Sequence, residues 1–124
     1  MKHILIALLL ISSVCNLKAQ DKERIVVLNR TEFKSQIENQ KVQLIDVRTP
    51  EEFQEGHIKG AQNIDYYSEG FTDEFNKLDK SKPVYLYCRS GSRSNQSAEK
   101  LSKMGFEVLY DLEGGFLNYI KKEE

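Results

Sequence analysis

The chain has 124 residues, enough for one domain of ordinary size and too few for two. Hydrophobic residues make up 40% of it and charged residues 30%, a balance that is typical of a compact globular protein and argues against disorder. The formal net charge of −1 argues against the strongly basic surface of a nucleic-acid-binding or membrane-surface protein.

The first nineteen residues have the pattern of a secretory signal peptide. A short polar start is followed by the apolar run 4–11 and by a polar segment that ends at Ala19. The apolar run is too short to span a bilayer, which needs about 20 residues. We therefore expect an exported, periplasmic protein with a signal peptide at 1–19 and one domain at 20–124.

Cys15 gives this segment a second interpretation. A cysteine just after an apolar run is the site at which a lipoprotein is anchored, although Val14 before it is larger than the residue usual there. The sequence favours cleavage after Ala19 and leaves anchoring through Cys15 open. Cleavage would leave Cys88 without a second cysteine, so the mature domain would have no internal disulfide.

Strands and helices alternate along the rest of the chain. In order, we predict a strand at 25–28, a helix from about 29 to 40, a strand at 42–47, helices at 49–56 and 70–78, a strand at 83–87, a helix at 94–104, a strand at 107–109 and a short helix after 114–115. The best helix start is at Thr49, where Pro50 and Glu52 complete a capping box. The alternation predicts a parallel sheet covered by helices on both faces.

The segment 88–94 carries the chemistry, because it joins a predicted strand to a predicted helix. Its sequence is Cys-Arg-Ser-Gly-Ser-Arg-Ser. In a parallel sheet this position is the carboxyl edge, where sites form. A short glycine-containing loop can turn backbone N–H groups inward, and the helix start adds further N–H groups and its dipole. With two arginines nearby, we expect Cys88 to be a thiolate nucleophile and not an inert buried cysteine.

Three separated segments resemble the rhodanese family of sulfurtransferases. The loop 88–94 is similar to the family's active loop, which commonly reads Cys-Arg-Ser-Gly-x-Arg-Ser. The segment 44–64, with Leu-Ile-Asp-Val-Arg, Glu-Glu-Phe and Gly-His-Ile-Lys-Gly-Ala, resembles the family's first signature, and 112–116 resembles its closing segment. The resemblance spans roughly residues 25–121 in the family's order and spacing, which makes it highly specific.

The resemblance implies a doubly wound parallel sheet and a persulfide mechanism. Catalytic Cys88 would take the outer sulfur of thiosulfate or a similar donor, release sulfite, and pass the sulfur to a thiol, to cyanide or to a protein acceptor. The rest of the loop would bind the substrate, with amides around the sulfur and guanidinium groups on the sulfonate oxygens; these residues are Arg89, Ser90, Gly91, Ser92 and Arg93. It implies no cofactor, and we expect a monomer with no nucleic-acid partner and no membrane span.

Polar residues around the loop are expected to support it and not to react. Asp46 and Arg48 lie on one side of a strand end and could pair with each other, Ser94 could add a hydroxyl donor, and His57 could brace a turn. Tyr66, Tyr67 and Phe71 could line the mouth of a pocket or simply pack. After cleavage one His and one Cys would remain, too few for the usual zinc site, so we predict no metal.

Three other functions are weighed against this pattern. Cysteine phosphatases and arsenate reductases resemble it with a loop that is one residue longer, Cys-x5-Arg, whereas here four residues separate Cys88 from Arg93. The shorter loop favours a single sulfur atom over a phosphate. A sulfur carrier that docks on a partner without turnover would have the same loop, and the sequence does not separate it from an enzyme. A thiol oxidoreductase generally needs a second cysteine, which the mature domain would lack.

Overall fold

The computed structural model describes residues 24–122, so the predicted signal peptide and Cys15 lie outside the described residues. The strands are β1 Ile25–Leu28, β2 Gln43–Asp46, β3 Gln62–Asn63, β4 Val84–Tyr87 and β5 Leu109–Leu112. The helices are α2 Arg30–Ile37, α3 Pro50–Glu55, α4 Phe71–Phe75, α5 Ser92–Lys103 and α6 Gly115–Tyr119. Between residues 24 and 122, no helix has the length and apolar character needed to cross a bilayer.

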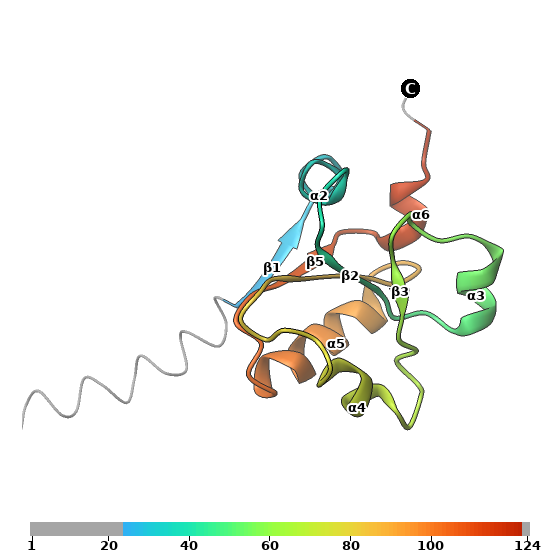
Figure 1. Cartoon of the computed structure of the whole chain (residues 1–124). Coiled ribbons are helices and arrows are strands. Elements are labelled where there is room, and N and C mark those ends of the chain that lie inside the picture. Colours follow the sequence, from blue (N-terminus) through green and yellow to red (C-terminus); the bar gives the residue numbers. More distant parts are fainter. Residues whose placement is uncertain (1–23, 123–124) are drawn as a thin grey trace, which may run out of the picture.

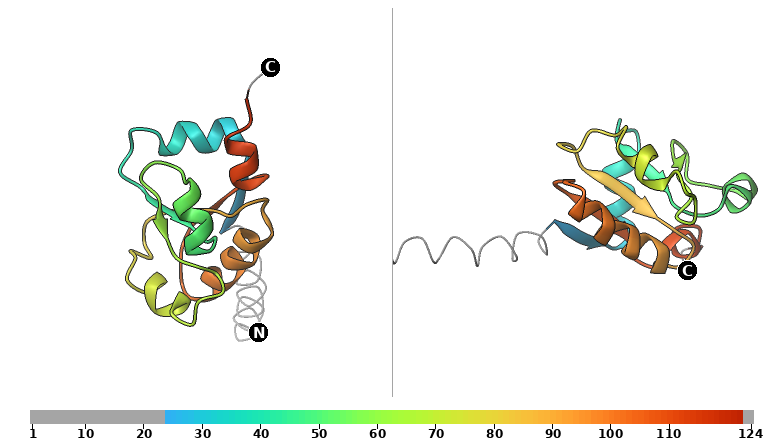
Figure 2. Two further views of the ribbon diagram at one scale, coloured as in Figure 1. Left: turned by 90° about the vertical axis from the view of Figure 1, so that its right-hand side faces the viewer. Right: turned by 90° about the horizontal axis from the view of Figure 1, so that it is seen from below.

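The strands form one parallel sheet in the order β1-β5-β4-β2-β3 (Figure 1). Helices α4 and α5 cover one face, and α2 and α6 cover the other (Figure 2). The predicted doubly wound parallel sheet with helices on both faces is therefore confirmed. Strand β4 lies in the middle, and all four of its residues are buried, as expected for a strand covered on both sides.

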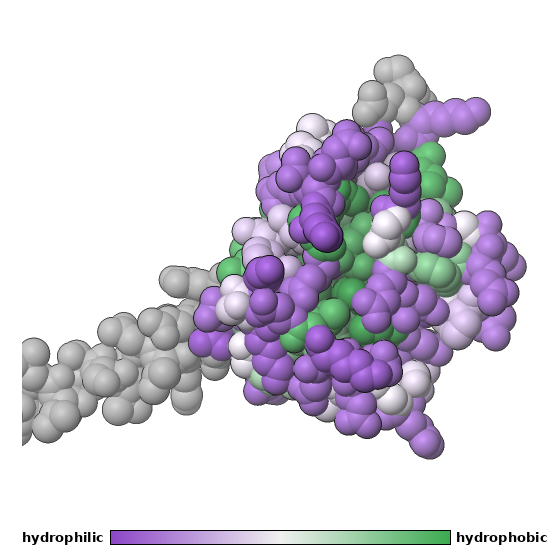
Figure 3. Space-filling model, in the orientation of Figure 1, coloured by the Kyte–Doolittle hydropathy of each residue, from purple (hydrophilic) through white to green (hydrophobic). Residues whose placement is uncertain are grey.

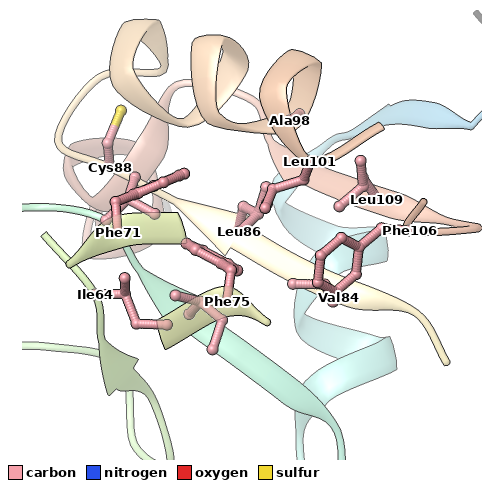
Figure 4. Packing of buried hydrophobic residues seen from close by; sticks show 12 residues of the cluster. Ile64, Phe71, Phe75, Val84, Leu86, Cys88, Ala98, Leu101, Phe106 and Leu109 are labelled. Carbon is pink, nitrogen blue, oxygen red and sulfur yellow. The ribbon is translucent and has the colours of Figure 1, made fainter. Parts of the chain in front are cut away.

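The sheet has an apolar core on each face. Along β4, Val84, Leu86 and then Cys88 belong to the core cluster under α5 (Figure 4). Tyr85 and Tyr87 alternate with them and belong to the cluster on the opposite face. Cys88 thus ends a row of core side chains and lies at the carboxyl edge of the central strand. On the face shown in Figure 3, hydrophilic residues cover the periphery and apolar residues lie at the centre.

Local sequence signals explain where several helices begin. The side chain of Asn29 accepts a hydrogen bond from the Glu32 N–H at the start of α2. At the start of α3, Thr49 and Glu52 form the predicted capping box around Pro50. The capping box at Thr49 is confirmed as predicted.

Several predicted boundaries are wrong. Helix α2 ends at Ile37 and not near 40, and α4 ends at Phe75 and not at 78. The last strand runs over Leu109–Leu112 and not over 107–109. The prediction ended too early because aspartate is rare in strands, whereas Asp111 is buried within this one. Helix α5 begins at Ser92, two residues before the predicted start at Ser94, because the left-handed Gly91 forms its N-cap. The two-residue β3 has no counterpart among the predicted strands, since two residues are too few to show an alternating pattern.

Candidate active site

Cys88 follows β4 directly, and its sulfur points towards the first turn of α5 (Figure 4). The residue is 1% exposed. The Gly91 N–H donates to Sγ at 3.0 Å, and the Cys88 thiol donates to Ser94 Oγ at 3.4 Å. Of the amides in the loop 88–94, which the structure describes in full, Gly91 supplies the one that bonds the sulfur. An N–H donor and a hydroxyl therefore lie against the nucleophile that the sequence predicts.

Gly91 gives the loop its shape. Its φ of 119° lies in the region that residues with a side chain rarely adopt, so glycine is required for this turn. Its carbonyl accepts the Asn95 N–H at 3.0 Å and the Ser94 hydroxyl at 3.2 Å, which joins the loop to the first turn of α5. The same residue thus turns one amide towards the sulfur and starts the helix whose dipole favours negative charge there.

The start of α6 holds the loop from its other side. The Phe116 N–H donates to the Cys88 carbonyl at 2.8 Å, and the Leu117 N–H donates to the Arg89 carbonyl at 3.1 Å. Gly115 approaches so closely that a Cβ placed on it would lie 2.6 Å from the carbonyl oxygens of both Cys88 and Arg89. With these carbonyls fixed outward, the peptide groups of the loop cannot rotate freely. Sequence reasoning missed this clamp, although the pair Gly114–Gly115 was its signal.

The predicted pair Asp46 and Arg48 is a buried ion pair beside the loop. Arg48 Nη2 and Nε donate to the Asp46 carboxylate at 2.7 and 3.0 Å, and Arg48 Nη2 also donates to the Gly56 carbonyl at 2.6 Å. The guanidinium group lies 4.3 Å from the centre of the Phe116 ring. Arg48 therefore connects the end of β2 to α3 and to α6, and its supporting role in the site stays a prediction.

Arg93 is paired with Glu52, a contact that the sequence did not suggest. Its two terminal nitrogens donate to the Glu52 carboxylate at 2.7 and 3.0 Å. The hydrogen bond from Arg93 is the main reason that the pKa of Glu52 is lowered to about 2. Glu52 thus caps α3 and also fixes the guanidinium group over the loop, so Arg93 is oriented by a carboxylate before any donor arrives. Its predicted contact with a donor stays a prediction.

The remaining loop residues face solvent. Arg89, Ser90 and Ser92 are exposed, and Arg89 is at the edge of a cavity of about 250 Å³ beside the loop. The cavity is lined by Arg48, Glu52, Glu55, Gly56, Arg89 and Phe116. The structure therefore places one exposed and one buried guanidinium group at this cavity, and the roles of the loop residues in binding stay predictions.

Residues at the margin of the site mainly pack. His57 Nδ1 lies 2.9 Å from the Phe53 carbonyl and its ring stacks on Phe53, as a turn brace would. Phe71 is buried in the core, whereas Tyr67 is 68% exposed with its ring centre 5.9 Å from the Arg93 guanidinium. Tyr67 is therefore the aromatic residue at the rim of the loop.

Asp111 is a buried acid near the loop that the sequence analysis did not select. It lies on β5 and is 3% exposed, and burial raises its pKa to about 6 against the lowering effect of Ser94 and Asn95. A lone aspartate in an apolar strand gives no local signal of a site. Only the pairing of β5 with β4, two separate segments of the chain, brings it near the site.

Comparison with known proteins places this geometry in a family. The family model of the rhodanese-like domain matches residues 29–122. The Bacillus subtilis protein YqhL is 47% identical over 76 residues, which cover 61% of this chain and 59% of YqhL, so the match spans less than two thirds of that relative. The thiosulfate sulfurtransferase GlpE of Shewanella oneidensis is 34% identical over 79 residues, which cover 64% of this chain and 76% of GlpE.

A solved structure gives the same result. The rhodanese-like domain protein of Staphylococcus aureus matches with a TM-score of 0.68 at 30% identity, covering 77% of this chain and 92% of that one. The two structures share the fold. The residues matched by the family model include the whole loop 88–94 and the start of α6 that holds it. This chain belongs to the rhodanese-like domain family.

Proposed function

We propose that the protein is a sulfurtransferase that moves sulfane sulfur from thiosulfate or a similar donor to a thiophilic acceptor through a persulfide on Cys88. The observation that carries this proposal is the Cys88 sulfur at the end of β4 with the Gly91 N–H at 3.0 Å and the start of α5 in front of it. Such fixed donors favour a sulfur anion over the neutral thiol. The name of the relative GlpE supports thiosulfate as the donor to test first.

The reaction would proceed in two displacements at sulfur. The Cys88 thiolate attacks the outer sulfur of thiosulfate, the S–S bond of thiosulfate breaks, and sulfite leaves with the bonding electron pair. The enzyme then carries Cys–S–S⁻, and the Gly91 N–H is the loop amide placed to stabilise its negative charge. Cyanide or a thiolate attacks that terminal sulfur, the new S–S bond breaks, and the Cys88 thiolate is regenerated.

Access to the sulfur involves the loop itself. Because Cys88 is 1% exposed, a donor has to approach over the loop, where Arg89 is exposed and Arg93 is held by Glu52. Both guanidinium groups would attract the dianionic thiosulfate. Among the described residues, no carboxylate is in contact with Arg89, so its N–H groups can bind the sulfonate oxygens without competition. Thiosulfate binding therefore depends more on Arg89 than on Arg93 in this proposal.

The proposed location is outside the cytoplasm. It rests on the predicted signal peptide at 1–19, with cleavage after Ala19 favoured over lipid anchoring at Cys15. Mass analysis of the protein purified from its own cells tests both, because cleavage leaves Gln20 as the first residue and anchoring adds lipid to Cys15. An intact chain that begins at Met1 would contradict export.

The central experiment is mass spectrometry of the mature protein after incubation with thiosulfate. We expect one added sulfur on the wild type and none on Cys88→Ser, since the variant lacks the only nucleophile that the proposal uses. Continued formation of thiocyanate on addition of cyanide would show turnover, whereas a single sulfur released per protein would favour a carrier. An unmodified wild type with thiosulfate would contradict the proposal.

A further inference from the structure

The cavity beside the active loop is formed by α3, the start of α6 and the residue that follows Cys88. Its volume is about 250 Å³, and its lining residues are Arg48, Glu52, Glu55, Gly56, Arg89 and Phe116. Pockets that bind drug-sized ligands have volumes of about 300–1,000 Å³. The cavity is slightly smaller, so it suits a molecule of the size of an amino acid.

The cavity adjoins the nucleophile through direct bonds to the active loop. Arg89 follows Cys88 in the chain, and the Phe116 N–H donates to the Cys88 carbonyl at 2.8 Å. Glu52 accepts a hydrogen bond from Arg93 of the loop at 2.7 Å. A ligand in this cavity therefore lies beside the residue that carries the sulfur.

The Arg48 side chain has an unused hydrogen-bonding group at this cavity, although it is only 5% exposed. Its Nε and Nη2 donate to the Asp46 carboxylate and to the Gly56 carbonyl. Within residues 24–122 nothing accepts a hydrogen bond from Nη1, and the one side-chain atom sealed there without a partner is Asp111 Oδ1. Nη1 of Arg48 is therefore not sealed, and its N–H groups open into the cavity that Arg48 lines.

Two further charged groups at the cavity are available to a ligand. Arg89 is exposed, and no carboxylate among residues 24–122 binds its guanidinium group. Of the two acids, Glu52 is occupied by Arg93 and Thr49, whereas Glu55 is exposed and no described residue binds its carboxylate. The cavity thus offers N–H donors of two guanidinium groups and one carboxylate.

This set of charges fits a molecule that has both a carboxylate and an ammonium group. Guanidinium groups bind carboxylate oxygens in forked pairs of hydrogen bonds, and a free carboxylate binds an ammonium group. A dianionic donor such as thiosulfate would use the guanidinium groups but would be repelled by Glu55. Cyanide would use neither kind of group. The complete set therefore matches the acceptor of the sulfur better than its donor.

We propose that this cavity binds the sulfur acceptor and that the acceptor is an amino-acid thiol of the size of free cysteine. Its carboxylate would bind Arg89 and Nη1 of Arg48, and its ammonium group would bind Glu55. This inference rests on the proposed function, because it names the chemical class of the acceptor in the second displacement.

The two displacements then use Arg89 in turn. Arg89 attracts the sulfonate of the donor first, and departure of sulfite leaves its guanidinium group free for the carboxylate of the acceptor. The acceptor thiol gives its proton to solvent, and the thiolate attacks the terminal sulfur of Cys–S–S⁻. A new S–S bond forms, the bond to Cys88 Sγ breaks, and Cys88 leaves with the electron pair as a thiolate. The product is the persulfide anion of the acceptor, so atoms and charge balance without another reactant.

The test is the rate at which three thiols remove sulfur from persulfide preloaded on Cys88. Loading uses thiosulfate in one series and inorganic polysulfide in another, excess reagent is removed, and mass spectrometry follows the loss of the added sulfur. The thiols are free L-cysteine, N-acetyl-L-cysteine, which lacks the ammonium group, and cysteamine, which lacks the carboxylate. Each thiol is compared between wild type and variant, so that its own reactivity cancels.

Glu55→Gln should slow the discharge by L-cysteine and by cysteamine about threefold to fivefold, the range of a solvent-exposed ion pair. The rate with N-acetyl-L-cysteine should not fall, because this thiol has no ammonium group to lose a partner. Arg89→Gln should give the complementary pattern, a loss with the two carboxylate-bearing thiols and none with cysteamine. Rates that change equally for all three thiols, or for none, would overturn the proposal.

Glu51→Gln is the matched control. Glu51 is an exposed acid on the same helix, α3, but it does not line the cavity. The substitution removes the same charge and should leave all three rates unchanged. A loss with L-cysteine as large as that in Glu55→Gln would mean that net charge and not the cavity sets the rate, against the proposal.

The two stages of the experiment separate this inference from the function on which it rests. A wild type that takes up no sulfur during loading contradicts the proposed function. A persulfide that forms, and that is then discharged without regard to the charges on the thiol, contradicts the acceptor site alone.

Discussion

At the scale of single residues, one buried ion pair lies beside the active loop. Asp46 and Arg48 have side chains that are 0% and 5% exposed and join at 2.7 Å. Removing two charges from water is costly, and the pair is tolerated because its hydrogen bonds are nearly all satisfied. Breaking such a pair is much more harmful than its net contribution suggests, since one charge is then left alone in the interior.

Asp46→Asn should therefore destabilise the domain by about 3 kcal/mol, because the buried Arg48 guanidinium loses its counter-charge. The measurement is urea unfolding followed by circular dichroism. Glu74→Gln is the matched control, since Glu74 and Lys77 join at the same distance of 2.7 Å but are exposed to solvent, where a pair contributes little. Equal losses in the two variants would contradict the importance of burial.

How far the sequence predicts residues of the site depends on their separation in the chain. Cys88, Gly91 and the pair Asp46 and Arg48 were selected because each belongs to a local pattern around a strand end. The contact between Glu52 and Arg93 joins residues 41 positions apart, and nothing in either local segment indicates it. Asp111 was missed for the same reason, since its importance depends on the pairing of β5 with β4.

At the scale of elements, the active loop is held between two helix starts. Helix α5 receives the loop at Gly91, and α6 binds the carbonyls of Cys88 and Arg89 through the amides of Phe116 and Leu117. These bonds fix the two peptide groups that lead to Gly91, whose N–H bonds the sulfur. The backbone at position 115 touches the backbone of the loop at Cys88 and Arg89, and only glycine is small enough to allow this.

Gly115→Ala should reduce sulfur transfer by more than tenfold and lower the stability by several kcal/mol. The added Cβ would lie 2.6 Å from loop carbonyl oxygens, and the φ of 62° is strained for any residue with a side chain. Thiocyanate production and thermal unfolding are the measurements. A normal rate in this variant would show that α6 does not position the loop.

Gly60→Ala is the control for this substitution. Gly60 also has a positive φ, of 89°, but a Cβ on it would meet no atom within 4 Å. We expect it to lose about 1 kcal/mol from backbone strain alone and to keep its activity. The difference between the two variants thus measures the close approach and not the strain.

Elements were predictable where propensity and burial agree. The continuous apolar strand Val84–Tyr87 and the capping box before Pro50–Glu55 are found where the sequence predicts them. The boundary of β5 was not, because a buried aspartate interrupts its apolar pattern, and tertiary packing overrides the local preference there. The mismatch between local pattern and structure thus lies at Asp111, next to the proposed chemistry.

At the scale of the whole molecule, two carboxyl groups give the stability opposite dependences on pH. The pKa of Glu52 is lowered to about 2 by Arg93, so its contribution is present above its ordinary value of 4.5 and is lost as the pH falls towards 2. The pKa of Asp111 is raised to about 6 by burial. Its contribution is present below its ordinary value of 3.8 and is lost as the pH rises through 6.

Asp111→Asn should for this reason be more stable than the wild type at neutral pH and lose that advantage in acid. The folded state binds the Asp111 proton more tightly than the unfolded state, and the difference between about 6 and 3.8 corresponds to roughly 3 kcal/mol of unfolding free energy. Urea unfolding at a series of pH values from about 4 to 7 measures it, with the exposed Asp73→Asn as control.

The shape of the difference curve decides the matter. The gap between Asp111→Asn and the wild type should open steadily between pH 3.8 and 6 and stay constant above, because the folded carboxyl is then already ionised. A gap of the same size at every pH would mean that the variant changes packing and not a buried charge.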